Sequence, residues 1–418
     1  MKFSNLQIFK FSNFFVSAAL CLLCACSGNG VKEPVRLELS SAEMSITDDC
    51  NDFSFELLKS VYANDATSEN IIVSPLSASM LLGMVMNGAD GNTLAQMRDV
   101  LDFDEDMSLL EINEYYRKLI DALPALDKTN KVCIANSIWA QNGYPFYDNF
   151  LNTNKKYFSA AVRNVDFSDS KTVDVINKWA SDNTNKLIPK VVEQQDLADV
   201  RMLLANALYF NGIWREEFDK SDTRQQEFTT SSGQAILVDR MNQTHDFAYA
   251  DLEDAQLLEM NYKENMYCMD ILLPAEGRSL NDIVDKLDAD SWRESLAKMD
   301  FFDVTVSMPK FKLGYNTSLV KALLKMGMSD AFNPMQADFS RMSENELYLS
   351  QVKQFCQLNV DEKGTEAAAI TWGTMKDSAV GPDFHRNFIV NRPFMLVIRE
   401  RQYGTILFIA TIGNPLAE

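Results

Sequence analysis

Histidine is scarce in this chain. The 418 residues include two histidines, His245 and His385, which lie far apart in the sequence. A metal site built on several histidines is therefore excluded, and a serine or cysteine hydrolase would have to use one of these two as its base. Ser378 and His385 could resemble a nucleophile and its base, but no catalytic motif surrounds either, and we interpret His385 as a solvated loop residue. An enzyme is the less expected class of protein, and we expect no cofactor and no metal.

Positive charge is also in deficit. Lysine and arginine total 39 against 59 aspartate and glutamate residues, which gives a formal net charge of -20. A nucleic-acid partner would need a basic face, so this class of function is excluded. The chain is 46% hydrophobic and 23% charged, which is ordinary for a globular protein and excludes disorder as its main state. No internal repeat or long low-complexity linker divides it, so we expect one large body.

The N-terminal segment differs in composition from the rest of the chain. No acidic residue occurs before Glu33, and two early lysines flank the start of the short apolar stretch FSNFFVSAALCLLCAC. This pattern is typical of a signal peptide, and the stretch is too short for a membrane-spanning helix. Its last letters, LCAC, resemble the bacterial lipobox. We interpret residues 1–25 as a lipoprotein signal peptide, Cys26 as the lipidated mature N-terminus and residues 26–46 as a tether.

Four cysteines remain beyond this segment, and they are widely separated: Cys50, Cys133, Cys268 and Cys356. Their spacing fits neither a zinc site nor a small disulfide scaffold. The last three lie in apolar or strand-like surroundings, which favours free, buried thiols. The sequence alone does not fix the redox state of the four.

Helix and strand patterns mix along the chain without regular alternation, which predicts an α+β fold. Ser74 and Pro75 open a helix, with Ser74 able to cap it. Residues 200–214 form an almost unbroken apolar run, interrupted by Asn206, and predict a central strand in which that amide needs a partner. Alternation over 302–308 predicts a half-buried strand. The strands 394–400 and 405–413 are separated by a short polar turn and should form a hairpin.

One segment, residues 361–388, is too long for an ordinary connection and lies between two strand regions. Every second residue from Thr365 to Met375 is small or uncharged, whereas Glu366 and Lys376 belong to the other parity. A strand needs this pattern when one face must enter a tight core and the other must meet solvent.

At this point the chain resembles the serpin family, and the resemblance covers nearly all of residues 50–418. Several motifs carry it in the family's order: NIIVSPLSASMLLGMVMNGADGNTLAQM from Asn70, INKWASDNTNKLI from Ile176, LLANALYFNGIW from Leu203, MPKF at 308–311, LLKMGMSDAF at 323–332, VDEKGTEAAAIT at 360–371 and NRPFMLVIRE at 391–400. The segment at 360–371 is the most specific, because it is similar to the hinge of inhibitory serpins.

The resemblance implies a single metastable domain, residues 47–418, with three β-sheets, eight or nine helices and an exposed reactive-centre loop at about 362–388. A protease attacks this loop and forms an acyl-enzyme. The cleaved loop then inserts as a new strand into the largest sheet and stalls deacylation. The hinge residues would be Glu362, Gly364, Thr365, Ala367, Ala368 and Ala369.

Other positions are matched to the family one at a time. Ser74, Ser77 and Asn206 match the shutter, where strands part beneath the central sheet, and Trp214 matches the top of that sheet, where insertion begins. Lys310 would pair with Glu362. Gln354 stands where many serpins have a shutter histidine, so a pH response of that histidine should not be transferred.

The scissile bond follows from the family's usual spacing, which places it at Ser378-Ala379. The segment from the hinge to NRPF is about four residues longer than usual, so Met375, Lys376 and Asp377 remain alternative positions. A serine would suit elastase- or subtilisin-like enzymes and a lysine would suit trypsin-like ones. Asp377 is the first charge on the inward parity, which marks where insertion must end.

The resemblance implies a suicide-substrate inhibitor of serine endopeptidases, with reach to cysteine proteases. The alternative is a non-inhibitory serpin-fold protein that binds partners at the cell surface. We expect a monomer that contacts the membrane only through its N-terminal lipid. We expect it in the cell envelope or at the cell surface as an exported lipoprotein. The target protease and the membrane face stay open.

Overall fold

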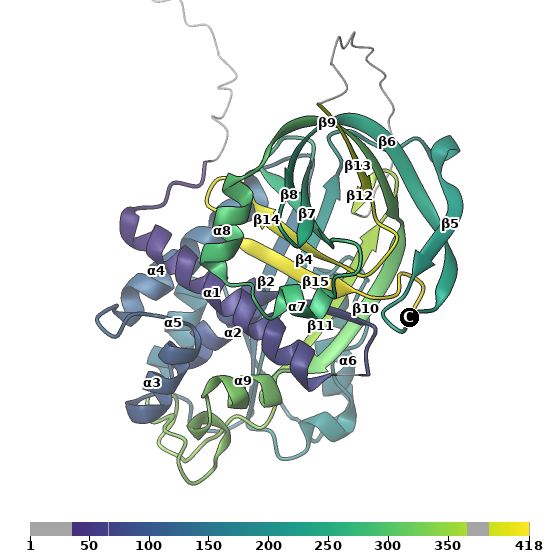
Figure 1. Cartoon of the computed structure of the whole chain (residues 1–418). Coiled ribbons are helices and arrows are strands. Elements are labelled where there is room, and N and C mark those ends of the chain that lie inside the picture. Colours follow the sequence, from purple (N-terminus) through teal and green to yellow (C-terminus); the bar gives the residue numbers. More distant parts are fainter. Residues whose placement is uncertain (1–35, 66, 366–383, 418) are drawn as a thin grey trace, which may run out of the picture. The chain divides into compact units, whose positions relative to one another are not determined.

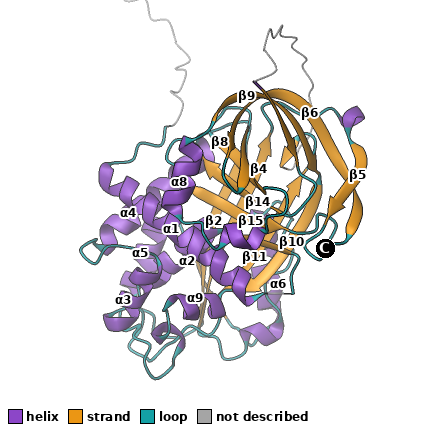
Figure 2. Cartoon of the chain, in the orientation of Figure 1, coloured by secondary structure: helices purple, strands orange, loops and turns teal. Residues whose placement is uncertain are grey.

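The computed structural model describes residues 36–65, 67–365 and 384–417. Helices gather on one side of this part of the chain and strands on the other (Figure 2), as expected for an α+β protein. The described residues contain nine α-helices: α1 (Ser41–Asn64), α2 (Pro75–Met86), α3 (Gly91–Val100), α4 (Leu109–Ala122), α5 (Asp148–Phe158), α6 (Ser170–Asn183), α7 (Leu280–Val284), α8 (Ala289–Ala297) and α9 (Val320–Met326).

The strands of the described residues form three sheets, labelled in Figure 1. They are β1 (Asn70–Val73), β2 (Lys131–Gln141), β3 (Ala161–Val165), β4 (Met202–Ile213), β5 (Arg224–Thr229), β6 (Ala235–Asp251), β7 (Ala255–Asn261), β8 (Tyr267–Pro274), β9 (Asp300–Pro309), β10 (Phe311–Ser318), β11 (Lys353–Val360), β12 (Gly364–Thr365), β13 (His385–Ile389), β14 (Phe394–Glu400) and β15 (Ile406–Ile412).

Nine strands make the largest sheet, in the order β1-β15-β14-β8-β7-β6-β9-β13, with β5 against β6. A second sheet has the order β12-β4-β2-β3, and β10 and β11 form a third. Within the described residues no strand pairing joins β4 directly to β11; the two-residue strand β12 is paired with β4 near the end of β11. Strands β4 and β11, which border this break in pairing, therefore belong to the two smaller sheets, whereas the resemblance placed insertion in the largest sheet.

Several predicted elements are confirmed. The apolar run after residue 200 forms β4, the alternating run forms β9, and the two C-terminal strands form the antiparallel pair β14 and β15. The first half of β4 is only half-buried, because it borders a cavity, whereas residues 207–210 are fully buried. The four cysteines named above are free; Cys133 is half-buried and the other three are buried. Burial raises the pKa of Cys50 and Cys356 to about 12.

The predicted end of the tether is wrong. Helix α1 begins at Ser41, inside the stretch assigned to the tether, and a capping box fixes its start. The Ser40 hydroxyl accepts a hydrogen bond from the backbone N–H of Glu43 (3.3 Å), and the Glu43 carboxylate accepts one from the backbone N–H of Ser40 (2.7 Å). Ile46 is already buried in the core. The folded part of the chain thus begins before residue 47.

The interpretation of His385 as a loop residue is also wrong. His385 is the first residue of β13, opposite Asp303 of β9, and its Nδ1 lies 2.8 Å from the Asp303 carboxylate. Its side chain is exposed, so it is solvated as expected. Among the described residues, no helix has both the length and the apolar character needed to cross a membrane.

Candidate functional site

The first residues of the predicted hinge are paired with a strand of the second sheet. After β11 the chain turns at residues 361–363, and Gly364 and Thr365 then pair antiparallel with β4, opposite Ile213 and Gly212 (Figure 1). Thr365 is 2% exposed. The first residue of the predicted inward parity is therefore buried already.

Glycine is required at position 364 by a close approach of two backbones. Gly364 has φ +151°, a conformation that residues with a side chain rarely adopt. A Cβ atom there would lie 1.9 Å from the carbonyl oxygen of Gly212. The sequence predicted backbone freedom at this position; the structure adds that there is no room for a side chain.

Two stacked aromatic rings contact the turn that precedes β12. The rings of Trp214 and Tyr262 lie 4.7 Å apart at 7°. The indole N–H of Trp214 donates to the carbonyl of Asp361 (3.0 Å), and its backbone N–H donates to the carbonyl of Lys363 (2.8 Å). The hydroxyls of Tyr262 and Thr365 share a hydrogen bond of 2.7 Å. The turn before β12 is therefore held from both sides.

The Glu362 carboxylate is a charged group in the turn before β12, and two side chains hold it. Its Oε1 accepts hydrogen bonds from the Thr223 hydroxyl (2.9 Å) and from the Lys310 ammonium (3.3 Å), so the expected contact with Lys310 is present. Burial alone would raise the pKa of Glu362, but these two partners and a backbone N–H outweigh it and hold the pKa below its ordinary value. Glu362 is therefore a buried, ionised anchor.

Two residues predicted to form the shutter, Ser77 and Asn206, are in contact at β4. The Ser77 hydroxyl donates to the Asn206 amide oxygen, and the Asn206 amide donates to the Asn136 side chain (2.7 Å). The predicted need of Asn206 for partners is thus met. Asn136 was not singled out in the sequence, although it interrupts the strand β2 much as Asn206 interrupts β4.

Gln354, a residue of β11, is hydrogen-bonded to Ser74, another residue predicted to form the shutter. Its side chain accepts a hydrogen bond from the backbone N–H of Ser74 (3.1 Å) and donates one to the Ser74 carbonyl (2.8 Å). The Ser74 hydroxyl donates to the carbonyl of Leu407 (2.8 Å) and does not cap helix α2. The predicted cap is therefore wrong: Ser74 occupies the N-cap position, but a neighbouring strand takes its hydroxyl.

A cavity of about 440 Å³ extends from the shutter along the space between the two smaller sheets. Residues 202–208 of β4 line one side, and residues 352–356 of β11 and its approach line the other. Ser77 of helix α2 and Ser74, which directly precedes that helix, also line it. The cavity thus borders the two strands that an inserted segment would have to join.

Part of the predicted site falls outside the described residues. This applies to the hinge alanines 367–369, to the reactive-bond positions Met375, Lys376, Asp377, Ser378 and Ala379, and to the lipidation site Cys26. The described chain resumes at Phe384, whose side chain is 56% exposed.

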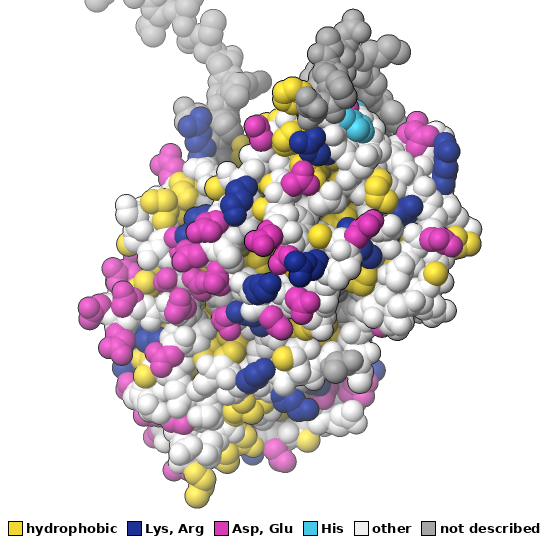
Figure 3. All heavy atoms as spheres, viewed as in Figure 1, with side chains coloured by type: hydrophobic (Ala, Val, Ile, Leu, Met, Phe, Trp, Pro, Cys, Tyr) yellow, Lys and Arg dark blue, Asp and Glu magenta, His cyan; other side chains and the backbone are white. Residues whose placement is uncertain are grey.

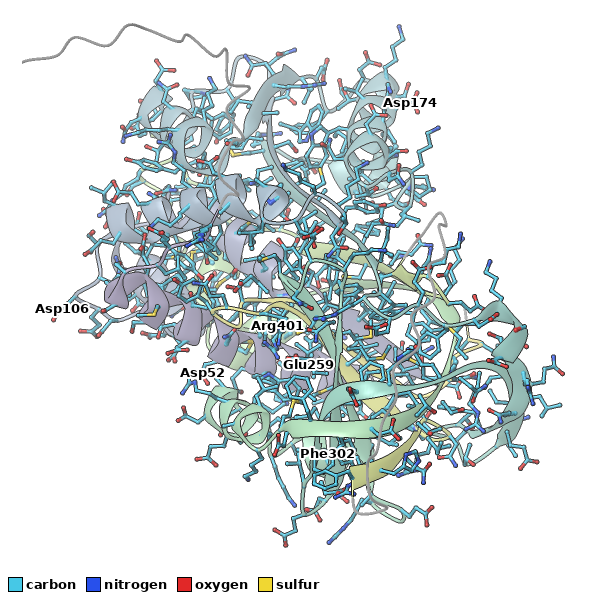
Figure 4. The ribbon with its side chains drawn as sticks, turned by 90° about the horizontal axis from the view of Figure 1, so that it is seen from above. Asp52, Asp106, Asp174, Glu259, Phe302 and Arg401 are labelled. Carbon is cyan, nitrogen blue, oxygen red and sulfur yellow. The ribbon has the colours of Figure 1, made fainter. Side chains whose placement is uncertain are left out.

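A buried group of carboxylates and a thiol offers metal-type ligands but is occupied by arginines. Glu259, Cys268 and Asp270 carry ligand atoms within 4.8 Å of one another. Arg399 donates to Asp270 (2.6 Å) and to Glu259 (2.6 Å), and Arg401 donates to Glu259 (2.8 Å; Figure 4). Each carboxylate already has a cationic partner, so this group is a structural ion network.

Known proteins that are similar to this chain agree with its fold and with the predicted hinge. The family model described as "Serpin (serine protease inhibitor)" matches residues 48–415. The chain is 30% identical over 375 residues to an uncharacterized serpin-like protein of Methanosarcina acetivorans, covering 87% of both chains. It is 32% identical over 363 residues to neuroserpin of Gallus gallus, covering 84% of this chain and 87% of that protein. The chain therefore belongs to the serpin family.

Solved structures show the same likeness. The native state of the thermophilic serpin tengpin matches with a TM-score of 0.81 at 31% identity, covering 90% of this chain and 95% of that one. Human thyroxine-binding globulin complexed with its hormone matches with a TM-score of 0.80 at 26% identity, covering 90% and 100%. The fold is thus shared by proteins whose names describe different activities.

Proposed function

We propose that this protein is a suicide-substrate inhibitor of serine endopeptidases, which traps the acyl-enzyme by inserting its cleaved loop between β4 and β11. The observation that carries the proposal is the position of the predicted hinge: Thr365 is buried against β4, and further along the same strand a cavity borders both β4 and β11. The small, uncharged residues that follow on the same parity could be buried at little cost in desolvation. Membership of the family alone would be weaker support, since its members differ in activity.

Incubation with trypsin-, elastase- and subtilisin-like proteases tests the proposal. We expect a complex with at least one of them that survives boiling in detergent, and a large rise in the melting temperature of the chain after loop cleavage. A protease whose catalytic serine is replaced by alanine should form no such complex. Cleavage without complex and without stabilisation would contradict the proposal. Mass spectrometry of the fragments locates the cut and decides between Ser378 and the alternatives Met375, Lys376 and Asp377.

A hinge variant provides the matched control. Thr365→Arg would place a charge at a site that is 2% exposed, where it cannot be solvated. We expect this variant to be cleaved at the same bond but to release active protease. A variant that still traps the protease would show that trapping does not depend on burial at position 365.

The non-inhibitory alternative, a surface protein that binds partners without trapping proteases, has support from the likeness to thyroxine-binding globulin. The same experiment separates the two functions, because a binding protein would be cleaved without forming a complex.

We also propose that the protein is exported and anchored by lipid on Cys26. The support is the sequence pattern of residues 1–26, which lie outside the described residues. Labelling of cells with a palmitate analogue should mark the wild type and the Cys24→Ser variant but not Cys26→Ser. Equal labelling of all three would contradict the assignment.

A further inference from the structure

The connection between α6 and β4, residues 184–201, is fastened firmly to α6. The Asn177 side chain accepts hydrogen bonds from the backbone N–H groups of Val191 (2.7 Å) and Val192 (3.0 Å) and donates one to the carbonyl of Val192 (2.9 Å). On the other side, Gln194 donates to the carbonyl of Phe167 (3.2 Å). Helix α6 and the connection therefore form one unit.

This unit has an apolar core of its own. Trp139 of β2, Trp179 of α6, and Val192 and Leu197 of the connection belong to a separate buried cluster, which also includes Ala207 of β4. Within the described part of the chain, β10 and β11 contribute no residue to it. Packing thus binds the connection to the β4 side of the cavity and not to the β11 side.

Asp196, in the connection, contacts β11 on the other side of the cavity. Its Oδ1 accepts a hydrogen bond from the ammonium of Lys353 (2.7 Å), the first residue of β11, and its carbonyl accepts one from Gln351 (3.3 Å). The side chains of Asp196 and Lys353 are 18% and 34% exposed. A bond from the backbone N–H of Glu193 to Oδ2 (2.9 Å) holds the Asp196 carboxylate in place. The contact is therefore partly shielded and preorganised.

Both residues of this pair line the cavity between the two smaller sheets, and both also line a second, more open cavity of about 520 Å³. The pair stands between the two spaces, at the end of β11 that is remote from the hinge. Lys353 lies seven residues before Val360, about 23 Å along the strand. An inserting segment would reach this end last. A new strand occupies about 4.8 Å of sheet width, more than a 2.7 Å contact can bridge.

We propose that the ion pair between Asp196 and Lys353 is a latch that controls the completion of loop insertion, and that these are positioning residues for trapping. The inference rests on the proposed function, because it assumes that the cleaved loop inserts at this place. The latch holds the connection to β11 in the resting protein and must open before the last part of the loop can pair with both strands.

The first test uses the full chain and needs no knowledge of the target protease. Subtilisin is used to cut the loop, and the rate of insertion is followed by tryptophan fluorescence, since Trp139 and Trp179 pack in one buried cluster with residues of the connection. Lys353→Gln keeps the stem of the side chain and removes its charge. We expect insertion to become about three- to ten-fold faster, the scale of one partly shielded ion pair. The matched control is Lys178→Gln, which removes the same charge from an exposed pair with Asp182 on α6 and should leave the rate unchanged.

A double-mutant cycle tests whether the two residues act as a pair. Asp196→Asn alone should accelerate insertion, and the combination with Lys353→Gln should be no faster than the single variants. Equal rates for wild type and Lys353→Gln, or fully additive effects, would overturn the latch. A wild type that gains no stability after cleavage would overturn both the latch and the inhibitor. A chain that inserts, responds to Lys353→Gln, yet never traps a protease would keep the latch and reject the inhibitor.

Discussion

The hydroxyl groups of Tyr262 and Thr365 share a hydrogen bond of 2.7 Å, although the two residues are 103 positions apart. Both side chains are buried, and burial raises the pKa of Tyr262 well above its ordinary value, so the tyrosine stays neutral. The bond joins the first residue of the inward parity to the ring that stacks on Trp214.

Removal of one partner of this bond should be more harmful than removal of both. Tyr262→Phe leaves the Thr365 hydroxyl buried without a partner and should lower the free energy of unfolding by about 1–3 kcal/mol. The double variant Tyr262→Phe with Thr365→Val should recover most of this loss, because no polar group remains unsatisfied. Chemical denaturation of the uncleaved chains measures both; a double variant less stable than Tyr262→Phe would contradict the contact.

Gly364→Ala should prevent the pairing of β12 with β4. The added Cβ cannot fit against the Gly212 carbonyl, and the required φ is strained for alanine by about 1–3 kcal/mol. We expect more protease-cleaved, uncomplexed product per trapped protease than in the wild type. Gly233→Ala is a suitable control, since its φ is also positive but nothing lies within 4 Å of the added atom. If Gly364→Ala and Gly233→Ala gave the same ratio of cleaved, uncomplexed product to trapped protease, the close approach of the two backbones would have no role in trapping.

Gln354→His should introduce a pH dependence that the wild-type side chain cannot have. A histidine held in this buried position must be neutral, so its folded-state pKa falls below the ordinary value of about 6.5. The unfolded chain then binds the proton more readily, and stability is lost as pH falls through that value. The melting temperature of the variant relative to the wild type should decrease from pH 8 to pH 5.5. A constant difference would show that position 354 is solvated.

The Asp49 carboxyl should make the folded chain less stable as the pH rises. It lies on α1, where burial and the nearby carboxylates of Asp102, Asp48, Asp52 and Asp104 raise its pKa to about 7. Acidic side chains gather over the helices at the left of the molecule in Figure 3. Because the folded-state pKa lies above the ordinary value, the stability it contributes is complete at low pH and is lost as pH rises towards 7.

The variant Asp49→Asn removes this loss. The side chain is only half-buried, so solvent screening limits the gain at pH 8 to about 1 kcal/mol. The gain should vanish near pH 4. Asp174→Asn, which removes an exposed charge from α6 (Figure 4), is the matched control for net charge. A gain that is the same at both pH values, or is shared by the control, would contradict the assignment. Thermal melts at the two pH values measure it.

The sequence predicted the elements whose local pattern is strong. Strand β4 and the pair β14 and β15 were recognisable because their apolar runs are longer than a partly exposed strand would tolerate. The start of α1 was missed although the capping-box spacing of Ser40 and Glu43 was present, because the polar residues around it favoured a spacer. The cap predicted at Ser74 failed because a tertiary acceptor, the carbonyl of Leu407, competes for the hydroxyl.

The contacts that complete the site could not be predicted in the same way. Tyr262, Thr223 and Asp196 lie in unremarkable polar segments, and their partners are more than 100 residues away. Nothing in the neighbouring sequence marks them, because their roles arise only when distant strands meet. The family resemblance supplied the hinge, Trp214 and Gln354, but it did not supply these partners.

The last two strands lie inside the largest sheet, and this determines whether a cleaved chain can separate into its two pieces. Strand β14 lies between β8 and β15, and every residue of both C-terminal strands is buried. A chain severed between residues 366 and 383 is therefore a two-chain molecule with a single shared interior, much like a noncovalent heterodimer. Its short chain cannot dissociate without unfolding the long one. Native mass measurement should register cleavage only as the added mass of one water, and the two pieces should separate only in denaturant.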